Sequence, residues 1–165
     1  MTTITRNAKS STSTASETAT PSAGRLVNLS AGTHGAVIAA VRVVVAFLFI
    51  CHGAQGLGAF GGIDGQGAGV AFGSWPGWWA TAIELVAGGL VLLGLFSRPA
   101  ALLCSGAMAY AYFVVHQPMG LLPLQNLGEQ AALFSWIFLL IAVLGPGSFA
   151  LDSLRRSRRS AVRTA

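Results

Sequence analysis

Charge is scarce in this chain. Only 9% of its 165 residues are Asp, Glu, Lys or Arg, whereas 53% are hydrophobic. A soluble domain carries about 25% charged residues, so this composition cannot cover a surface exposed to water. At this length the chain makes one domain, and we expect no separate catalytic domain beside it. The composition predicts an integral membrane protein.

Cysteine is also scarce. Cys51 and Cys104 lie in separate apolar runs, with neither CxxC spacing nor a nearby histidine pattern typical of zinc. On helices of a bundle they would stand roughly 15 Å apart along the axis, whereas a disulfide needs Cα atoms within about 7 Å. We therefore expect neither a metal site nor a disulfide within the chain.

Most of the positive charge lies near the two ends of the chain. The net charge is +5, while most of the middle of the chain is uncharged. Basic ends around an apolar middle favour anionic lipid headgroups, so we expect a lipid bilayer and no nucleic acid as partner. Residues 1–33 are rich in Ser and Thr and lack periodic apolar positions, which predicts a disordered cytoplasmic tail. Residues 151–165 are predicted to be a basic cytoplasmic tail.

Four apolar stretches fill residues 34–150, at about 36–55, 77–96, 100–115 and 127–144. Each is close to the ~20 residues with which a helix crosses a ~30 Å hydrocarbon layer. Backbone groups in lipid must be paired within the segment, and long runs without alternation favour helices over strands. The sequence predicts an all-α fold, a transmembrane four-helix bundle.

The distribution of Lys and Arg predicts the orientation. Basic residues precede the first helix, follow the fourth, and include Arg98 in the second turn, whereas the first and third loops contain none. The positive-inside rule then places both termini in the cytoplasm, an N-in/C-in topology. The Gly-rich connection 56–73 is therefore outside, and either folds back onto the bundle or is a flexible loop. The leucines of the third loop are expected at the interface.

Polar side chains within the apolar segments are the candidates for a functional site, because each is costly in hydrocarbon unless paired or hydrated. Their positions along the helices bring groups from all four helices to the outer leaflet. In the third helix one polar face repeats at Ser105, Ala109, Tyr112 and His116. We expect a binding cluster of His52, Glu84, Tyr112, His116, Asn126 and Glu129, with no catalytic residue.

Glu84 is the first candidate, since it lies deepest. Side chains lean toward the N-terminus of their helix, so His52 and Glu84 lean toward each other. We expect Glu84 either to be protonated part of the time or to hydrogen-bond to His52 or Tyr112. Arg42 is expected to extend to the cytoplasmic headgroups.

Simpler interpretations of these residues stay open. His116, Asn126 and Glu129 are near enough to the interface to be merely solvated, and Glu84 could serve only as an interhelical hydrogen-bond partner. The small residues Gly53, Gly88 and Gly89 predict either close helix packing or a ligand slot beneath the polar cluster.

Several segments together resemble the DoxX family of small bacterial four-helix membrane proteins. They are HGAQGLGAFGG (52–62), IELVAGGLVLLGLFSRPAALL (83–103), AMAYAYFVVHQPMGLLPLQNLGEQAALF (107–134) and GPGSFALD (145–152). The positions in the family's pattern are Arg42, His52, Gly53, Glu84, Gly89, Arg98, Pro99, His116, Pro118, Asn126, Glu129 and Asp152. One position departs, because the family commonly has a lysine where this chain has Gly56.

The resemblance implies a protein of the bacterial plasma membrane. DoxX-like proteins are similar to a small subunit of a membrane thiosulfate:quinone oxidoreductase, and actinobacterial relatives are linked with thiol and oxidative-stress defence. We therefore expect an accessory subunit of a redox or oxidative-stress complex, with a quinone site in the polar cluster and soluble redox partners at the cytoplasmic face.

A different class of function stays open beside this one. A carboxylate with nearby histidines is also typical of a small-molecule or proton-coupled transporter, or of a lipid-binding module. A wide passage would then require a homo-oligomer. An enzyme acting alone is the least expected, since the sequence shows no nucleophile–base pair, metal cluster or P-loop.

Overall fold

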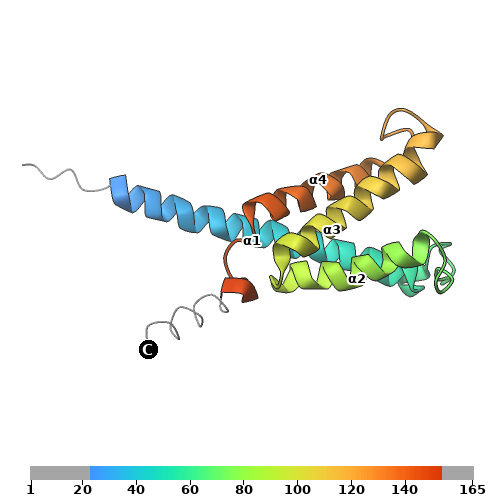
Figure 1. The fold of residues 1–165 in the computed structure, drawn as a ribbon, viewed down its shortest axis with the longest axis horizontal. Helices are drawn as coiled ribbons and strands as arrows, with labels where there is room; N and C mark the ends of the chain where they lie inside the picture. The colour runs from blue at the N-terminus through green and yellow to red at the C-terminus, as the bar shows by residue number, and fades with distance from the viewer. Residues whose placement is uncertain (1–22, 154–165) are drawn as a thin grey trace, which may run out of the picture.

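The computed structural model describes residues 23–153, which form an all-helical fold (Figure 1). The long helices are α1 (Ala23–Gly56), α2 (Gly77–Leu93), α3 (Ser97–Tyr110) and α4 (Glu129–Leu144). Three short segments join them: the 3-10 turns η1 (Ala59–Gly61) and η3 (Gln117–Met119), and the π-helical segment η2 (Ala111–His116). Apart from an isolated bridge between Gly62 and Ala68, no strand occurs within residues 23–153. The predicted all-α class is confirmed.

The start of α1 differs from the prediction. The helix begins at Ala23 and not near Ala36, so residues 23–33 of the predicted disordered tail are helical. No proline follows Pro21 before the helix ends at Gly56. Once the apolar run nucleates a helix, each further residue adds a hydrogen bond, and the helix extends to the next strong breaker. Residues 1–22 of the predicted tail and most of the basic tail lie outside the described residues.

Within residues 23–153, two helices are long and apolar enough to cross a membrane, over Gly32–Gly56 and Ser97–Met119. The other two apolar helices, α2 and α4, are shorter, at 17 and 16 residues.

The helices pack as two antiparallel pairs. α1 lies along α2 and α3 lies along α4 (Figure 1). The two pairs are joined by contacts of α2 with α3 and by side chains between α1 and α4, such as Phe49. A Cβ added at Gly53 would lie 2.8 Å from Leu85 Cγ, and one at Gly88 would lie 3.2 Å from Phe49 Cδ1. These two glycines thus permit the close α1–α2 packing that was predicted, whereas Gly89 faces open space.

A reciprocal serine pair joins α3 to α4. Ser105 Oγ donates to the Ser135 carbonyl over 2.8 Å, and Ser135 Oγ donates to the Ser105 carbonyl over 3.1 Å. Both hydroxyls are satisfied in an apolar setting, which removes the cost of burying them.

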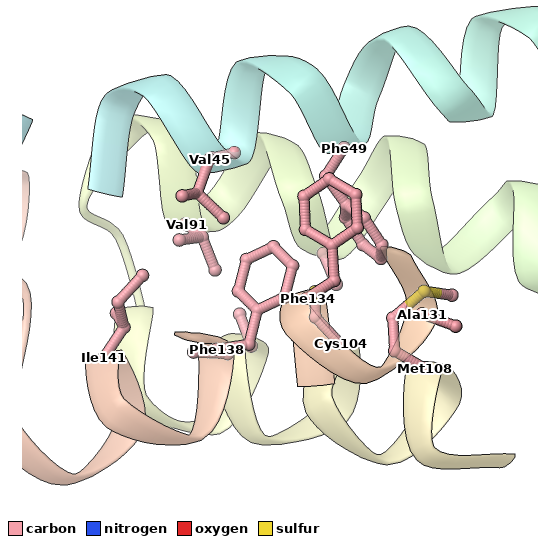
Figure 2. Packing of buried hydrophobic residues seen from close by; sticks show 13 residues of the cluster. Val45, Phe49, Val91, Cys104, Met108, Ala131, Phe134, Phe138 and Ile141 are labelled. Atoms are coloured by element: carbon pink, nitrogen blue, oxygen red, sulfur yellow. The ribbon is translucent and has the colours of Figure 1, made fainter. Parts of the chain in front are cut away.

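The core lies at mid-bundle and is aromatic. The Phe49 ring packs against the Phe134 ring at 5.4 Å and against the Phe138 ring at 4.7 Å between centroids. Figure 2 shows these side chains gathered between the helices, with Val91 and Cys104 beside them. Phe49, Phe138, Val91 and Cys104 have no exposed surface. Cys104 is therefore a packed free thiol; Cys51 is also free and is partly buried.

The inner end of the bundle, defined by the α2–α3 turn at residues 94–97, is closed by the segment after α4. Gly94 terminates α2 in the left-handed region, with the Leu95 N–H donating to the Leu90 carbonyl. The Asp152 carboxylate accepts from the Ser97 N–H at the start of α3, where the helix dipole favours a negative charge. The Asp152 N–H donates to the Gly94 carbonyl. The segment 145–152 is thus hydrogen-bonded to the α2–α3 turn and covers this end of the bundle.

The prediction that Arg42 extends to the headgroups was wrong. Its side chain is only 2% exposed, and its guanidinium donates to the carbonyl oxygens of Val91 and Leu92, each over 3.1 Å. A longer contact of 3.5 Å reaches the Phe149 carbonyl. The last carbonyls of a helix lack partners within it, and α2 ends beside Arg42, so the guanidinium caps that helix.

The Gly-rich loop, residues 57–76, and the third loop, residues 117–128, form the outer end. Within the Gly-rich loop, the Asp64 carboxylate accepts from the N–H groups of Gln66 and Ala68, which lowers the pKa of Asp64. The Val70 N–H donates back to the Gly56 carbonyl, and the Gln55 side chain donates to the Gly62 carbonyl. The loop therefore folds back onto the end of α1, as one of the two predicted alternatives had it.

Candidate functional site

A cavity of about 300 Å³ lies toward the outer end of the bundle. Four polar side chains line it, one from each helical region: His52 of α1, Glu84 of α2, His116 of η2 and Gln130 of α4. The rest of its wall is mostly apolar and consists of Ala80, Met108, Ala111, Leu127, Ala131 and Phe134. The few polar groups thus converge on one space from different elements, an arrangement typical of small-molecule sites.

Gly53 sets the distance between the first two polar residues. A Cβ at this position would lie 3.0 Å from Glu84 Cβ, so α1 and α2 approach this closely only because the residue is glycine. The closeness places His52, the neighbour of Gly53, and Glu84 on the wall of the same cavity. Within the described chain, no hydrogen bond links Glu84 to His52 or Tyr112, so the bond predicted for Glu84 is not formed.

The π-helical segment η2 brings His116 into the cavity. In an α-helix, the face that carries Met108 and Ala111 would continue at Val115, which is 44% exposed here. The wider turn shifts the register by one residue, and His116 takes that place. Pro118 is a local cause of the π-helical turn, because its ring crowds the carbonyl four residues before it and disturbs the α-helical hydrogen bonds. The Gln117 N–H accordingly bonds to the Tyr112 carbonyl, five residues back.

The third loop fixes the orientation of the His116 ring. His116 Nδ1 lies 3.0 Å from the Asn126 carbonyl oxygen. A carbonyl can only accept, so Nδ1 carries the hydrogen, and Nε2 of the neutral ring is an acceptor.

The Asn126 side chain bonds to the backbone of the third loop and does not line the cavity. It is 1% exposed, its amide nitrogen donates to the Gly120 carbonyl, and its amide oxygen accepts from the Gly128 N–H, each over 2.8 Å. Every strong hydrogen-bonding group of its side chain is thus directed at backbone that would otherwise be unpaired.

Gln130 is the cavity residue that sequence reasoning missed. Its Nε2 donates to His52 Nε2 over 2.6 Å, and this bond joins α4 to α1. The signal was present in the spacing, because Gln130 stands four and eight residues before Phe134 and Phe138, both buried. Glu129, one residue earlier, shares its stripe with Leu133 and Trp136, which are 56% and 71% exposed.

The structure separates the six predicted site residues into two groups. His52, Glu84 and His116 line the cavity. The described residues that line it do not include Tyr112, Asn126 or Glu129. Tyr112 packs beside the core and the third loop, and Glu129 is exposed in the first turn of α4, where the helix dipole favours its charge.

The cavity combines one carboxyl group with donors and acceptors of hydrogen bonds. Lys and Arg are absent from the described residues that line it. In residues 23–153, no group of three His, Cys, Asp or Glu residues is placed to hold a metal ion. The arrangement can therefore bind a small polar group by hydrogen bonds beside apolar walls.

Comparison with known proteins covers most of this region. The DoxX family model matches residues 37–117. A protein of Haemophilus influenzae described only as uncharacterized is 40% identical over 119 residues, which make up 70% of this chain and 88% of that protein. No solved structure matches the chain. The family match includes His52, Glu84 and His116, whereas Gln130 lies beyond it.

Proposed function

The chain belongs to the DoxX family of membrane proteins, and from this premise we propose that it binds the head of a quinone-type lipid in the outer cavity. It does so as an accessory subunit of a redox or oxidative-stress complex in the bacterial plasma membrane. The observation that carries the proposal is the convergence of four polar side chains from four helical regions on one cavity of about 300 Å³.

The proposed topology has four crossings, with both termini in the cytoplasm. Neither outer loop contains Lys or Arg, while Arg98 lies at the inner end together with the segment that leads into the basic tail. The positive-inside rule then assigns the inner end to the cytoplasm. The cavity accordingly belongs to the outer half of the bilayer.

The residues present fit a quinone head. Its two carbonyl oxygens accept hydrogen bonds, for which the Gln130 amide and a histidine N–H are donors. The hydroxyl groups of the reduced form donate, and the Glu84 carboxylate and His116 Nε2 are acceptors. A volume of about 300 Å³ is at the small end of ligand sites, enough for a ring but not for a lipid tail.

The packed core favours binding over transport. Phe134 belongs both to the cavity wall and to the aromatic core, and beneath it Phe49 and Phe138 are fully buried (Figure 2). Side chains packed this densely leave no path for a solute from the cavity to the inner end of a single chain. The transporter alternative would therefore require a passage outside this bundle.

Removing the carboxylate tests the proposal. In purified full-length protein, the reduced quinone decylubiquinol is titrated and tryptophan fluorescence is followed, with Glu84→Gln compared against wild type, because its hydroxyl groups are the donors that the Glu84 carboxylate accepts from. One hydrogen bond to a charged group is worth roughly 1.5 kcal/mol or more, so we expect about tenfold weaker binding.

Glu129→Gln is the matched control, because it makes the same change at the same end of the bundle but outside the cavity. Its affinity should equal that of wild type. If wild type does not bind decylubiquinol, or if both variants weaken binding equally, the proposed site is wrong.

A further inference from the structure

A second hollow lies beside the cavity, at the seam between α1 and α4. It has a volume of about 370 Å³ and is lined by Leu48, Cys51, His52, Gln55, Phe60 and Gln130. We call it the lateral groove. His52 and Gln130 are the two residues that it shares with the cavity, so the pair forms the partition between the two spaces.

The lateral groove faces outward. Leu48 is 49% exposed and Phe60 is 77% exposed. In the proposed topology, such a surface meets the acyl chains of the outer leaflet, so a molecule dissolved in the membrane reaches the groove without passing through water.

We propose that the His52–Gln130 hydrogen bond is a gate between this lateral entrance and the Glu84 cavity. The inference rests on the proposed function and adds how the ligand reaches the site. The bond joins α1 to α4, and it stands where the two hollows meet.

Gln130 is the moving part. The His52 ring is supported by an edge-on contact with the Phe134 ring, at 6.0 Å between centroids, and Phe134 is held in the core. Gln130 is exposed, and within the described residues its side chain bonds to His52. A single side-chain hydrogen bond is a small barrier, and exposed side chains change rotamer rapidly. Rotation of Gln130 away from His52 opens the partition without moving a helix.

The geometry also defines the class of ligand. The cavity holds a small head with hydrogen-bonding oxygens, while the apolar part of the groove, at Leu48 and Phe60, is suited to an attached hydrocarbon tail. The expected ligand is a membrane-dissolved amphiphile whose head passes the gate and whose tail stays in the groove.

Thiol labelling tests the gate without any ligand. Full-length protein with Cys51→Ala and Ala111→Cys, which places a thiol on the cavity wall, is reconstituted in liposomes and labelled with N-ethylmaleimide. Adding Gln130→Ala should raise the labelling rate about tenfold, the factor for loss of one hydrogen bond. Gln130→Leu should also raise it, because leucine fills the wall but cannot bond to His52.

Glu129→Ala is the control, since it alters the same turn of α4 outside the cavity and should leave the rate unchanged. Equal rates for the Gln130 variants and this control overturn the gate, as does an increase with Gln130→Ala but not with Gln130→Leu, which would mark a steric wall. Faster labelling in a protein that does not bind decylubiquinol supports the gate while refuting the proposed ligand.

Discussion

Arg42 provides the sharpest test of how the inner end is held together. Substitution by alanine removes two hydrogen bonds of 3.1 Å from a buried guanidinium to the final carbonyls of α2. At about 1.5 kcal/mol for each bond to a charged group, the loss is about 3 kcal/mol. The cavity left behind adds to this loss, whereas the buried Arg42 Nε, which has no partner in the described chain, offsets part of it.

Unfolding by SDS in mixed micelles, followed by circular dichroism, measures this free energy. Arg98→Ala is the control, because Arg98 lies at the same end of the bundle but is exposed. Arg42→Met should lose less stability than Arg42→Ala, since methionine fills much of the space. Limited proteolysis should cut the segment 145–152 faster in Arg42→Ala than in wild type, because the contact of Arg42 with the Phe149 carbonyl is lost as well. If Arg42→Ala and Arg98→Ala unfold within about 0.5 kcal/mol of each other, the capping role is refuted.

Two further predictions concern the outer loops. Asn126→Ala leaves the Gly120 carbonyl and the Gly128 N–H without their partner, so backbone hydrogen exchange across the third loop should become faster by roughly tenfold. The same exchange rate in Asn126→Ala and in the control Gln125→Ala would contradict this role. In the Gly-rich loop, the N–H groups that bond to Asp64 hold its pKa below the ordinary value of 3.8. The order that Asp64 confers is thus full above pH 3.8 and is lost as the pH falls through the lower pKa of the folded state, which NMR of those N–H groups can follow. A midpoint at or above 3.8, or the same transition in Asp64→Asn, would contradict it.

The sequence predicted the helices well because hydrophobic runs and their breakers are local signals. The predicted end of the fourth helix coincides with the end of α4 at Leu144, where Gly145 and Pro146 follow. The predicted start of the second helix coincides with Gly77. The start of α1 was missed because the prediction began the helix with the apolar run. The polar residues before that run carry no local signal that excludes them from the helix.

The candidate site was predicted only in part, because membership of the cavity depends on helix rotation. The expected stripe on the third helix assumed α-helical spacing up to His116, but the π-helical turn rotates the last residues and leaves Tyr112 beside the loop. Arg42 was misplaced for a related reason, since its partners are backbone carbonyls of α2 that no side-chain pattern reveals.

The short length of α4 explains why the outer loops are so apolar. Its 16 residues span about 24 Å, which is roughly 6 Å less than a hydrocarbon layer of ~30 Å. Leu121, Leu124 and Leu127, in the loop directly before α4, are 80%, 78% and 79% exposed. In the proposed topology these side chains supply the missing apolar thickness. A loop can occupy that depth only if its backbone is paired, and Asn126 provides this pairing from within the loop. The backbone carbonyl of the same residue orients His116, so the fit of the loop to the membrane and the shape of the cavity both depend on one buried residue.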